Sequence, residues 1–223
     1  GSVSLDWGTD IIDRRQSSAP KAHSSLLAVF IDEVLKEHRI TLKECRAVAV
    51  SGGPGSYTGL RVGVSTAKGL CFASSLPLIA VSSLEVIAQL TVDHDHGEAP
   101  YRIFPMIDAR RMEVYTSPYY IVETGDLGKM ANREGPVAAV EVTGESFREA
   151  LDAGPVVFSG DGAMKCRDVI VHPNARFLPE ASHADGMAKA ALKAFRDQEF
   201  EDVAYYTPRS EEHTSELQSP NTI

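Results

Sequence analysis

The sequence predicts an α/β protein with a mixed β-sheet, divided into two subdomains. Helical patterns alternate with short apolar, strand-like runs along most of the chain, which is typical of this class. A polar loop at residues 93–100 separates the long helical patterns from a stretch that opens with two alternating, strand-like runs. The 223 residues are 43% hydrophobic and 24% charged, a globular composition with enough chain for two cores.

The first half is expected to contain two strands, two long helices and a glycine loop. Residues 2–8 and 10–17 read as strands around a Gly-Thr turn. The apolar positions of residues 23–38 cover about half of a helix circumference, a wider stripe than packing on one sheet requires. Either this helix lies deep in its own core, or it also contacts another chain. A second helix is expected over residues 60–73.

The second half is expected to hold a further group of paired strands, followed by a last helix. The alternating runs predict the strands, and a 3.6-residue apolar period predicts the helix. The expected elements are strands at 102–110, 112–122, 137–143 and 156–159 and an amphipathic helix at 184–198.

Charge and cysteine usage narrow the classes of function. The net charge of −9 is unfavourable for a phosphate backbone, so we do not expect this chain to bind nucleic acid directly by itself. Cys45, Cys71 and Cys166 are scattered without a CxxC pair, which indicates a reducing cytosol and no zinc site. No apolar run approaches the length of a membrane span.

The glycine loop Ser51–Gly59 is the most informative motif of the chain. It lies between a strand at 47–50 and the second helix, an arrangement that points backbone N–H groups at an anion. Its spacing matches neither a P-loop, a dinucleotide fingerprint nor a hydrolase elbow. Two interpretations stay open, a purely structural turn or an anion loop. The anion loop would use Gly52, Gly53, Gly55, Ser56, Thr58 and Gly59.

Two smaller motifs also allow two interpretations each. Asp108 and Arg110 fall at a predicted turn between strands, where they either orient a ligand or close a hairpin. Asp161, between two glycines, either meets a nucleotide or caps the following helix. His94 and His96 have no third metal ligand nearby in the sequence. No metal site, catalytic residue or nucleophile–base pair is assigned, which favours a binding or scaffold subunit over a self-sufficient enzyme.

Several segments together resemble one protein family. SGGPGSYTGLRVGVSTAKGL followed by PLIAVSSLEVIA closely resembles the signature of the bacterial TsaB (YeaZ) family. HSSLLAVFIDEVL resembles the first long helix of that family, and IDARRMEVY resembles its second-domain hairpin. The resemblance covers about residues 2–208.

The resemblance implies a sugar-kinase/actin-like (ribonuclease H-like) fold with two subdomains and mixed sheets. The family begins with a strand that is missing here, because the chain joins at the family's next strand. The divisions implied are residues 1–98, incomplete at the start, and 99–182. Residues 183–208, a helix and a strand remnant, would pack back on the first subdomain. Residues 209–223 contain RSEEHTSELQSP, which matches the translation of a sequencing adapter, so we expect an artificial tail.

The resemblance also implies a role in making N6-threonylcarbamoyladenosine at position 37 of tRNA, in the cytoplasm. In that family TsaB is not the catalyst: it binds its paralogue TsaD through a helical bundle, and the ATPase TsaE joins them. The chain would then contact tRNA only indirectly and need no cofactor, although binding of ATP or ADP stays open. The interface residues carried over are Leu26, Leu27, Phe30, Val34, Arg61, Val64, Ser65 and Lys68.

Two other functions remain as alternatives. One is a nucleotide-binding ATPase or a peptidase-like enzyme of the same superfamily. The other is a homodimer that uses the same helix pair when TsaD is absent.

Overall fold

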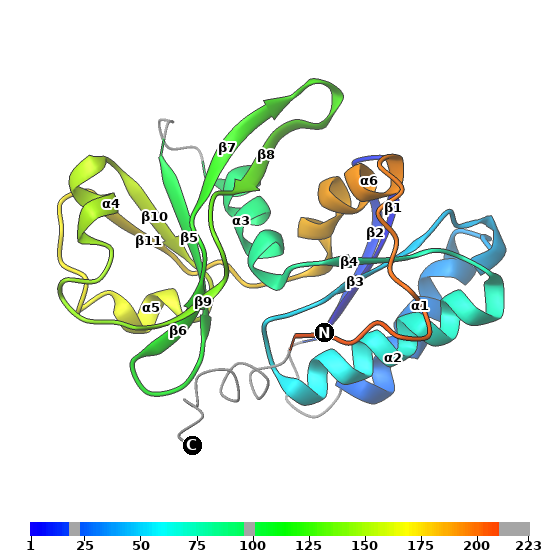
Figure 1. Ribbon diagram of the computed structural model, residues 1–223. Helices are drawn as coiled ribbons and strands as arrows, with labels where there is room; N and C mark the ends of the chain where they lie inside the picture. The colour runs from blue at the N-terminus through cyan, green and yellow to red at the C-terminus, as the bar shows by residue number, and fades with distance from the viewer. Residues whose placement is uncertain (18–22, 96–100, 210–223) are drawn as a thin grey trace, which may run out of the picture. The chain divides into compact units, whose positions relative to one another are not determined.

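The computed structural model describes residues 1–17, 23–95 and 101–209, and it divides into two compact units (Figure 1). Unit 1 comprises Gly1–Ser83 together with the chain from His183, and unit 2 comprises Leu84–Ser182. No helix within the described ranges is long and apolar enough to cross a membrane.

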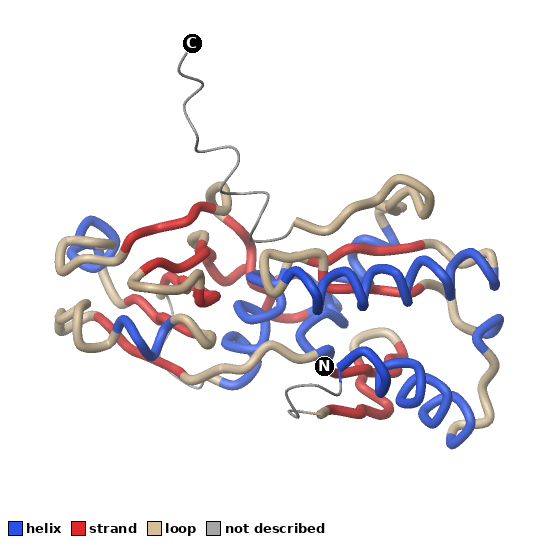
Figure 2. The backbone as a smooth tube through the Cα atoms, turned by 90° about the horizontal axis from the view of Figure 1, so that it is seen from below, coloured by secondary structure: helices blue, strands red, loops and turns tan. Residues whose placement is uncertain are grey.

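Unit 1 is built from two separate pairs of strands and two long helices. Strands β1 (Ser2–Trp7) and β2 (Asp10–Gln16) form an antiparallel hairpin, and β3 (Val48–Ser51) runs parallel to β4 (Leu78–Val81). Helices α1 (His23–Glu37) and α2 (Tyr57–Ser74) lie side by side, α1 against the hairpin and α2 against β3 (Figure 2). The short helix η1 (Leu42–Glu44) precedes β3.

The end of the chain completes unit 1. The 3₁₀ helix η3 (Ala184–Met187) contacts both β1 and β3, and α6 (Ala188–Arg196) contacts β4. The two strand pairs remain separate sheets, so β1 and β3 are not bonded neighbours. The single helix expected over residues 184–198 is two helices in the structure, because its first turn is the 3₁₀ helix η3 and the α-helix α6 begins only at Ala188. Of the expected tail, only Arg209 lies within the described residues.

Unit 2 holds one seven-stranded mixed sheet. The central strand β5 (Arg102–Asp108) is parallel to β10 (Val156–Ser159), which is parallel to β11 (Ala175–Leu178). On its other side β5 is antiparallel to β6 (Glu113–Thr116) and β7 (Tyr119–Thr124). The remaining elements are β8 (Gly128–Arg133), β9 (Ala138–Glu141), η2 (Gly125–Leu127), α3 (Ser83–His94), α4 (Arg148–Ala153) and α5 (Ala163–Cys166).

Two expectations are corrected by this sheet. The single strand predicted over 112–122 is two strands, β6 and β7, separated at Ser117-Pro118, since proline has no N–H to continue a ladder. The boundary predicted between residues 98 and 99 lies between 83 and 84 instead. Helix α3 belongs to unit 2 because Leu84, Ile87 and Val92 pack in the same buried cluster as residues of β5.

Candidate functional site

The glycine loop is filled by the chain itself. Gly52 and Gly53 are buried. A Cβ on Gly52 would lie 2.3 Å from Tyr206 Oη, and a Cβ on Gly53 would lie 2.1 Å from the carbonyl oxygen of Arg209. The Arg209 N–H also donates to the Gly52 carbonyl at 2.9 Å. These two glycines are therefore required by the close approach of residues 206–209 and are not open to an anion, which corrects that part of the prediction.

The later part of the loop begins helix α2. Ser56 is its N-cap, and the Ser56 hydroxyl accepts a 3.5 Å bond from the Gly59 N–H. Ser56, Thr58 and Gly59 are exposed, and Gly55 is half-buried. The other end of the loop is bonded to β4 and to the first residue of α3. The Gly52 N–H donates to the Val81 carbonyl at 2.8 Å, and the Ser83 N–H donates to the Gly53 carbonyl at 2.9 Å. Anion binding by the exposed part remains a prediction.

Lys68 holds the end of the chain against α2. Its Nζ donates to the carbonyl of Ala204 at 3.0 Å and to that of Tyr206 at 3.1 Å. Beneath it, Val203 and Tyr206 pack against the buried cluster of Ala67, Cys71 and Leu78. The ammonium group of Lys68, a residue expected at the partner interface, is thus bound to the chain's own carbonyls.

The predicted partner face is partly exposed and partly internal. Val34 and Val64 are only 2% and 3% exposed, so these two residues belong to the core of unit 1, which corrects the prediction. They lie on the inward faces of helices that pack on their own sheets. Arg61 and Ser65 are exposed, and Leu26, Leu27 and Phe30 are half-buried.

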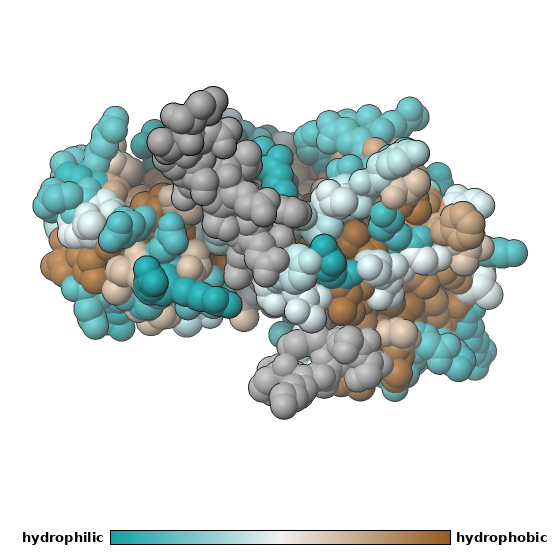
Figure 3. Space-filling view, turned by 60° about the horizontal axis from the view of Figure 1, so that its bottom comes forward, coloured by the Kyte–Doolittle hydropathy of each residue, from teal (hydrophilic) through white to brown (hydrophobic). Residues whose placement is uncertain are grey.

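Two apolar residues that the prediction missed enlarge this face. Val29 on α1 is 43% exposed and Phe72 on α2 is 85% exposed. Figure 3 shows hydrophobic residues gathered at the surface on the side where α1 and α2 come forward. The helical period places Phe72 one turn beyond Lys68 on the face of Arg61 and Ser65, but Phe72 was not among the expected interface residues. We call Leu26, Leu27, Val29, Phe30, Arg61, Ser65 and Phe72 the helix face.

The two helices of this face differ in charge. Helix α2 carries Arg61 and Lys68 and no carboxylate, whereas α1 exposes three carboxylates and one lysine. Asp32 pairs with Lys36 on α1 itself, and Glu37 pairs with Arg15 of the hairpin. The Arg61 guanidinium lies over the Tyr57 ring, 4.2 Å from its centre. A face with an acidic helix beside a basic one can pair with a similar face turned by a half-rotation, because each helix then meets its opposite charge.

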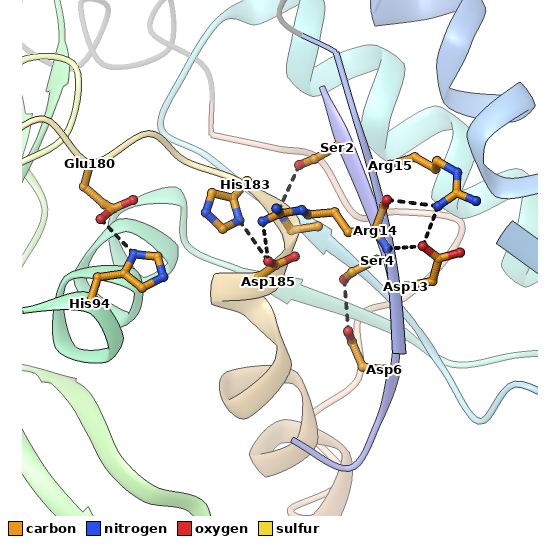
Figure 4. Close-up of polar contacts among 11 residues, drawn as sticks. Ser2, Ser4, Asp6, Asp13, Arg14, Arg15, His94, Glu180, His183 and Asp185 are labelled. Carbon is orange, nitrogen blue, oxygen red and sulfur yellow. Dashed lines mark hydrogen bonds and ion pairs between the residues drawn. The ribbon is translucent and has the colours of Figure 1, made fainter. Parts of the chain in front are cut away.

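A second polar group joins the hairpin to the returning chain. Asp185 accepts a 2.6 Å bond from Arg14 Nη1, the Ala184 N–H donates to Ser2 Oγ at 2.8 Å, and His183 Nδ1 lies 3.5 Å from Asp185 (Figure 4). These contacts fasten η3 to β1 and β2 and are structural. In unit 2, His94 pairs with Glu180 at 3.0 Å, and His96 lies outside the described residues. No cluster of metal-ligating side chains occurs in the described part of the chain.

The two small motifs of unit 2 form one structure. The Asp108 carboxylate accepts bonds from the Arg110 N–H, at 2.8 Å, and from Lys165 Nζ. The Asp161 carboxylate in turn accepts a 3.2 Å bond from the Asp108 N–H. Hydrogen bonding to Lys165 lowers the pKa of Asp108. Asp108 thus closes the hairpin between β5 and β6, and the Gly160–Gly162 turn supports it from the neighbouring strand.

Comparison with known proteins identifies the family. The sequence model of TsaD, described as tRNA N6-adenosine threonylcarbamoyltransferase, matches residues 17–214. The chain belongs to this family. The match runs into the segment expected to be an artificial tail. The predicted actin-like α/β fold class is confirmed by this match and by the solved relatives below.

Several similar relatives are TsaB proteins. The tRNA threonylcarbamoyladenosine biosynthesis protein TsaB of Haemophilus influenzae is 38% identical over 99 residues, 44% of this chain and 41% of the relative. TsaB of Escherichia coli is 33% identical over 124 residues, 56% of this chain and 52% of the relative. An uncharacterised protein of Mycobacterium tuberculosis is 31% identical over 149 residues, 66% and 67% of the two chains. The chain spans about half the length of the TsaB relatives it matches.

The fold has a close counterpart among solved structures. YeaZ from Pseudomonas aeruginosa superposes with a TM-score of 0.80 at 25% identity, covering 93% of this chain and 92% of the other. A second structure with the same values is described as an uncharacterized protein with similarity to peptidase YEAZ. The resemblance to the TsaB (YeaZ) family is confirmed.

Proposed function

We propose that the chain is a non-catalytic partner subunit in the biosynthesis of N6-threonylcarbamoyladenosine at position 37 of tRNA. Its partner is TsaD, the transferase, and the contact is made through the helix face. Family membership supports the pathway, because TsaB relatives carry that role in their names. The observation that carries the contact is the exposure of Phe72 and Val29 on two adjacent helices, since exposed apolar side chains that gather on one side of a protein favour contact with a partner.

Shared ancestry supports TsaD as the partner. A chain of the TsaD family and the transferase itself have related folds, so related helix pairs can meet about a pseudo-twofold axis. The same geometry allows two copies of this chain to pair when the transferase is absent, and the ATPase TsaE joins as a third component.

Phe72→Asp tests the contact, because it places a carboxylate at the most exposed apolar position of the helix face. We expect at least a tenfold loss of affinity for purified TsaD, since an aromatic anchor residue contributes about 2 kcal/mol or more to an interface. Val171→Asp is the matched control, because Val171 is a comparably exposed apolar residue of unit 2. Affinity is measured by calorimetry, and circular dichroism checks the fold. Equal affinities of the two variants for TsaD would show that the helix face does not make the contact.

The chain needs no cofactor in this proposal, and it acts in the cytoplasm. The alternative, an ATPase, predicts that a nucleotide binds at the exposed Ser56–Gly59 turn and is hydrolysed. Calorimetry with ATP and with ADP separates the two, because micromolar binding accompanied by turnover is the result expected of an ATPase. In the proposed role neither nucleotide is hydrolysed by the isolated chain.

A further inference from the structure

The hairpin loop between β5 and β6 has an unusual backbone. Arg110 and Arg111 adopt φ values of +70° and +46°, two successive residues in the left-handed region that favours glycine. Such residues persist only where the surrounding structure holds them, and they gather at binding and catalytic sites. Neither position carries the glycine or asparagine that would relieve the strain, so the loop keeps two arginines at a conformational cost.

Lys165 on α5 holds this loop. Its Nζ donates to the carbonyls of Glu113 at 2.7 Å, Arg111 at 3.0 Å and Arg110 at 3.5 Å, and to the Asp108 carboxylate. One ammonium group therefore contacts three carbonyls of the turn and the Asp108 carboxylate, and so links α5 to the loop.

The Gly160–Gly162 turn lies directly against β5 at the foot of the loop. A Cβ on Gly160 would lie 2.3 Å from the Met106 carbonyl oxygen, and one on Gly162 would lie 2.9 Å from the Ile107 carbonyl carbon. The Gly162 N–H also donates to the Met106 carbonyl at 3.0 Å. The Gly160–Gly162 turn thus packs closely against the backbone of β5, the strand that leads into the loop.

In this arrangement the carboxylates near the loop are hydrogen-bonded, whereas the two arginine side chains are exposed. The carboxylates of Asp108 and Asp161 are turned to Lys165 and to backbone N–H groups. The side chains of Arg110 and Arg111 are exposed. Within the described residues, no ion pair or hydrogen bond engages either guanidinium. Two unneutralised arginines thus project from a rigid loop of a chain whose net charge is −9.

We propose that the Arg110–Arg111 loop is a phosphate-binding site. Guanidinium groups bind phosphate oxygens through paired N–H donors, and a rigid loop loses little entropy on binding. The phosphate belongs either to the backbone of tRNA or to a free nucleotide, and Lys165 is a positioning residue that acts through the loop. Only the choice of tRNA as one probe rests on the proposed function, and a direct contact with tRNA would correct the expectation that this chain meets tRNA only indirectly.

The first test replaces both arginines. Arg110→Ala/Arg111→Ala is compared with Arg133→Ala/Arg167→Ala, which removes the same charge from exposed positions of the same unit. The full chain is titrated into fluorescent, unmodified tRNA at several salt concentrations, and pyrophosphate is titrated by calorimetry. We expect at least a tenfold loss of tRNA affinity and a reduction of about two in the salt slope. The control should retain most of the affinity.

The two probes separate the sources of phosphate. Loss of tRNA binding alone assigns the site to a nucleic-acid backbone, and loss of pyrophosphate binding alone assigns it to a nucleotide. If the wild-type chain binds neither probe, or if the control variant loses as much as the test variant, the proposal is wrong. None of these results depends on binding to TsaD, so failure of the helix face is recognised separately.

Two further variants distinguish binding from folding. Arg110→Gly/Arg111→Gly keeps the left-handed backbone and removes both guanidiniums, so we expect loss of phosphate binding with an unchanged or higher melting temperature. Lys165→Met keeps both arginines and releases the loop, so we expect weaker binding with the full positive charge of the loop still present. Wild-type phosphate affinity in both variants would contradict the proposal.

Discussion

The glycine loop of unit 1 and the Arg110–Arg111 loop of unit 2 differ in what occupies them. The first has the more conspicuous sequence, yet Tyr206 and Arg209 fill the space beside its glycines. The second has no glycine at its strained positions, and its arginines have no partner among the described residues. A glycine in a loop thus shows that another atom lies close to its backbone, and that atom can belong to the same chain as well as to a ligand. A strained non-glycine residue marks a side chain that the fold retains despite an energetic penalty.

The largest expected effect is that of Gly53→Ala. Gly53 has φ +97°, and a Cβ there would lie 2.1 Å from the Arg209 carbonyl oxygen. Strain and steric overlap together should lower the free energy of unfolding by roughly 3 kcal/mol. Gly8→Ala is the control, because Gly8 has φ +68° and nothing within 4 Å of its Cβ position. The control should lose about 1 kcal/mol in urea unfolding. Equal losses would show that residues 206–209 do not fill the loop.

Lys68→Met should have the next largest effect. It removes two hydrogen bonds from a charged donor to the carbonyls of Ala204 and Tyr206, and we expect a loss of about 1–2 kcal/mol. The effect should be concentrated in residues 203–209. Hydrogen exchange of the Arg209 amide, which is bonded to Gly52, is the sensitive measurement. Unchanged protection of that amide would mean that Lys68 does not hold the segment.

The loss of stability at acidic pH should depend in part on Asp108. Its pKa is lowered by the hydrogen bond from Lys165, so the folded state favours the ionised carboxylate. Its contribution is therefore complete above the ordinary carboxyl pKa near 4 and is lost as the pH falls through the lower folded value. In Asp108→Asn the melting temperature should be lower than in the wild type at pH 6, and the difference should narrow towards pH 2. A constant difference across this range would exclude the carboxylate–ammonium contact.

The smallest expected effect is that of Arg111→Gly alone. Glycine adopts φ +46° without a Cβ penalty, so stability should rise by up to about 1 kcal/mol. Arg133→Gly is the contrasting control, because Arg133 ends strand β8, where glycine is unfavourable. Thermal unfolding of the two variants should change in opposite directions. A loss of stability in Arg111→Gly would show that the loop is not strained.

The sequence was sufficient wherever the signal is local. The apolar period of residues 23–38 predicted α1 nearly to its ends, and the alternation in residues 2–17 predicted the hairpin. The motifs in the glycine loop and in residues 107–115 were enough to indicate the family. Strand β8 was missed because its sequence, GKMANR, has a weak alternating pattern and gains its place from pairing with β7.

The candidate site was predictable only in part. A helical wheel places Val34 and Val64 on apolar stripes, but it does not say whether the stripe meets the chain's own sheet or another protein. Phe72 is as apolar as Val34 and Val64, but it is 85% exposed, whereas the two valines are buried. The connection between Asp108, Lys165 and Asp161 joins residues more than 50 positions apart, so no spacing rule could reveal it.

By itself, the sequence determined the types of element, the α/β class and the family, because periodicity and short motifs are properties of neighbouring residues. The tertiary structure decided which helix positions are covered, where unit 2 begins and what lies beside each glycine. A glycine in the sequence reports that a side chain is excluded there. Only the folded chain shows that residues 206–209 exclude it in one loop, while β5 excludes it below the two arginines.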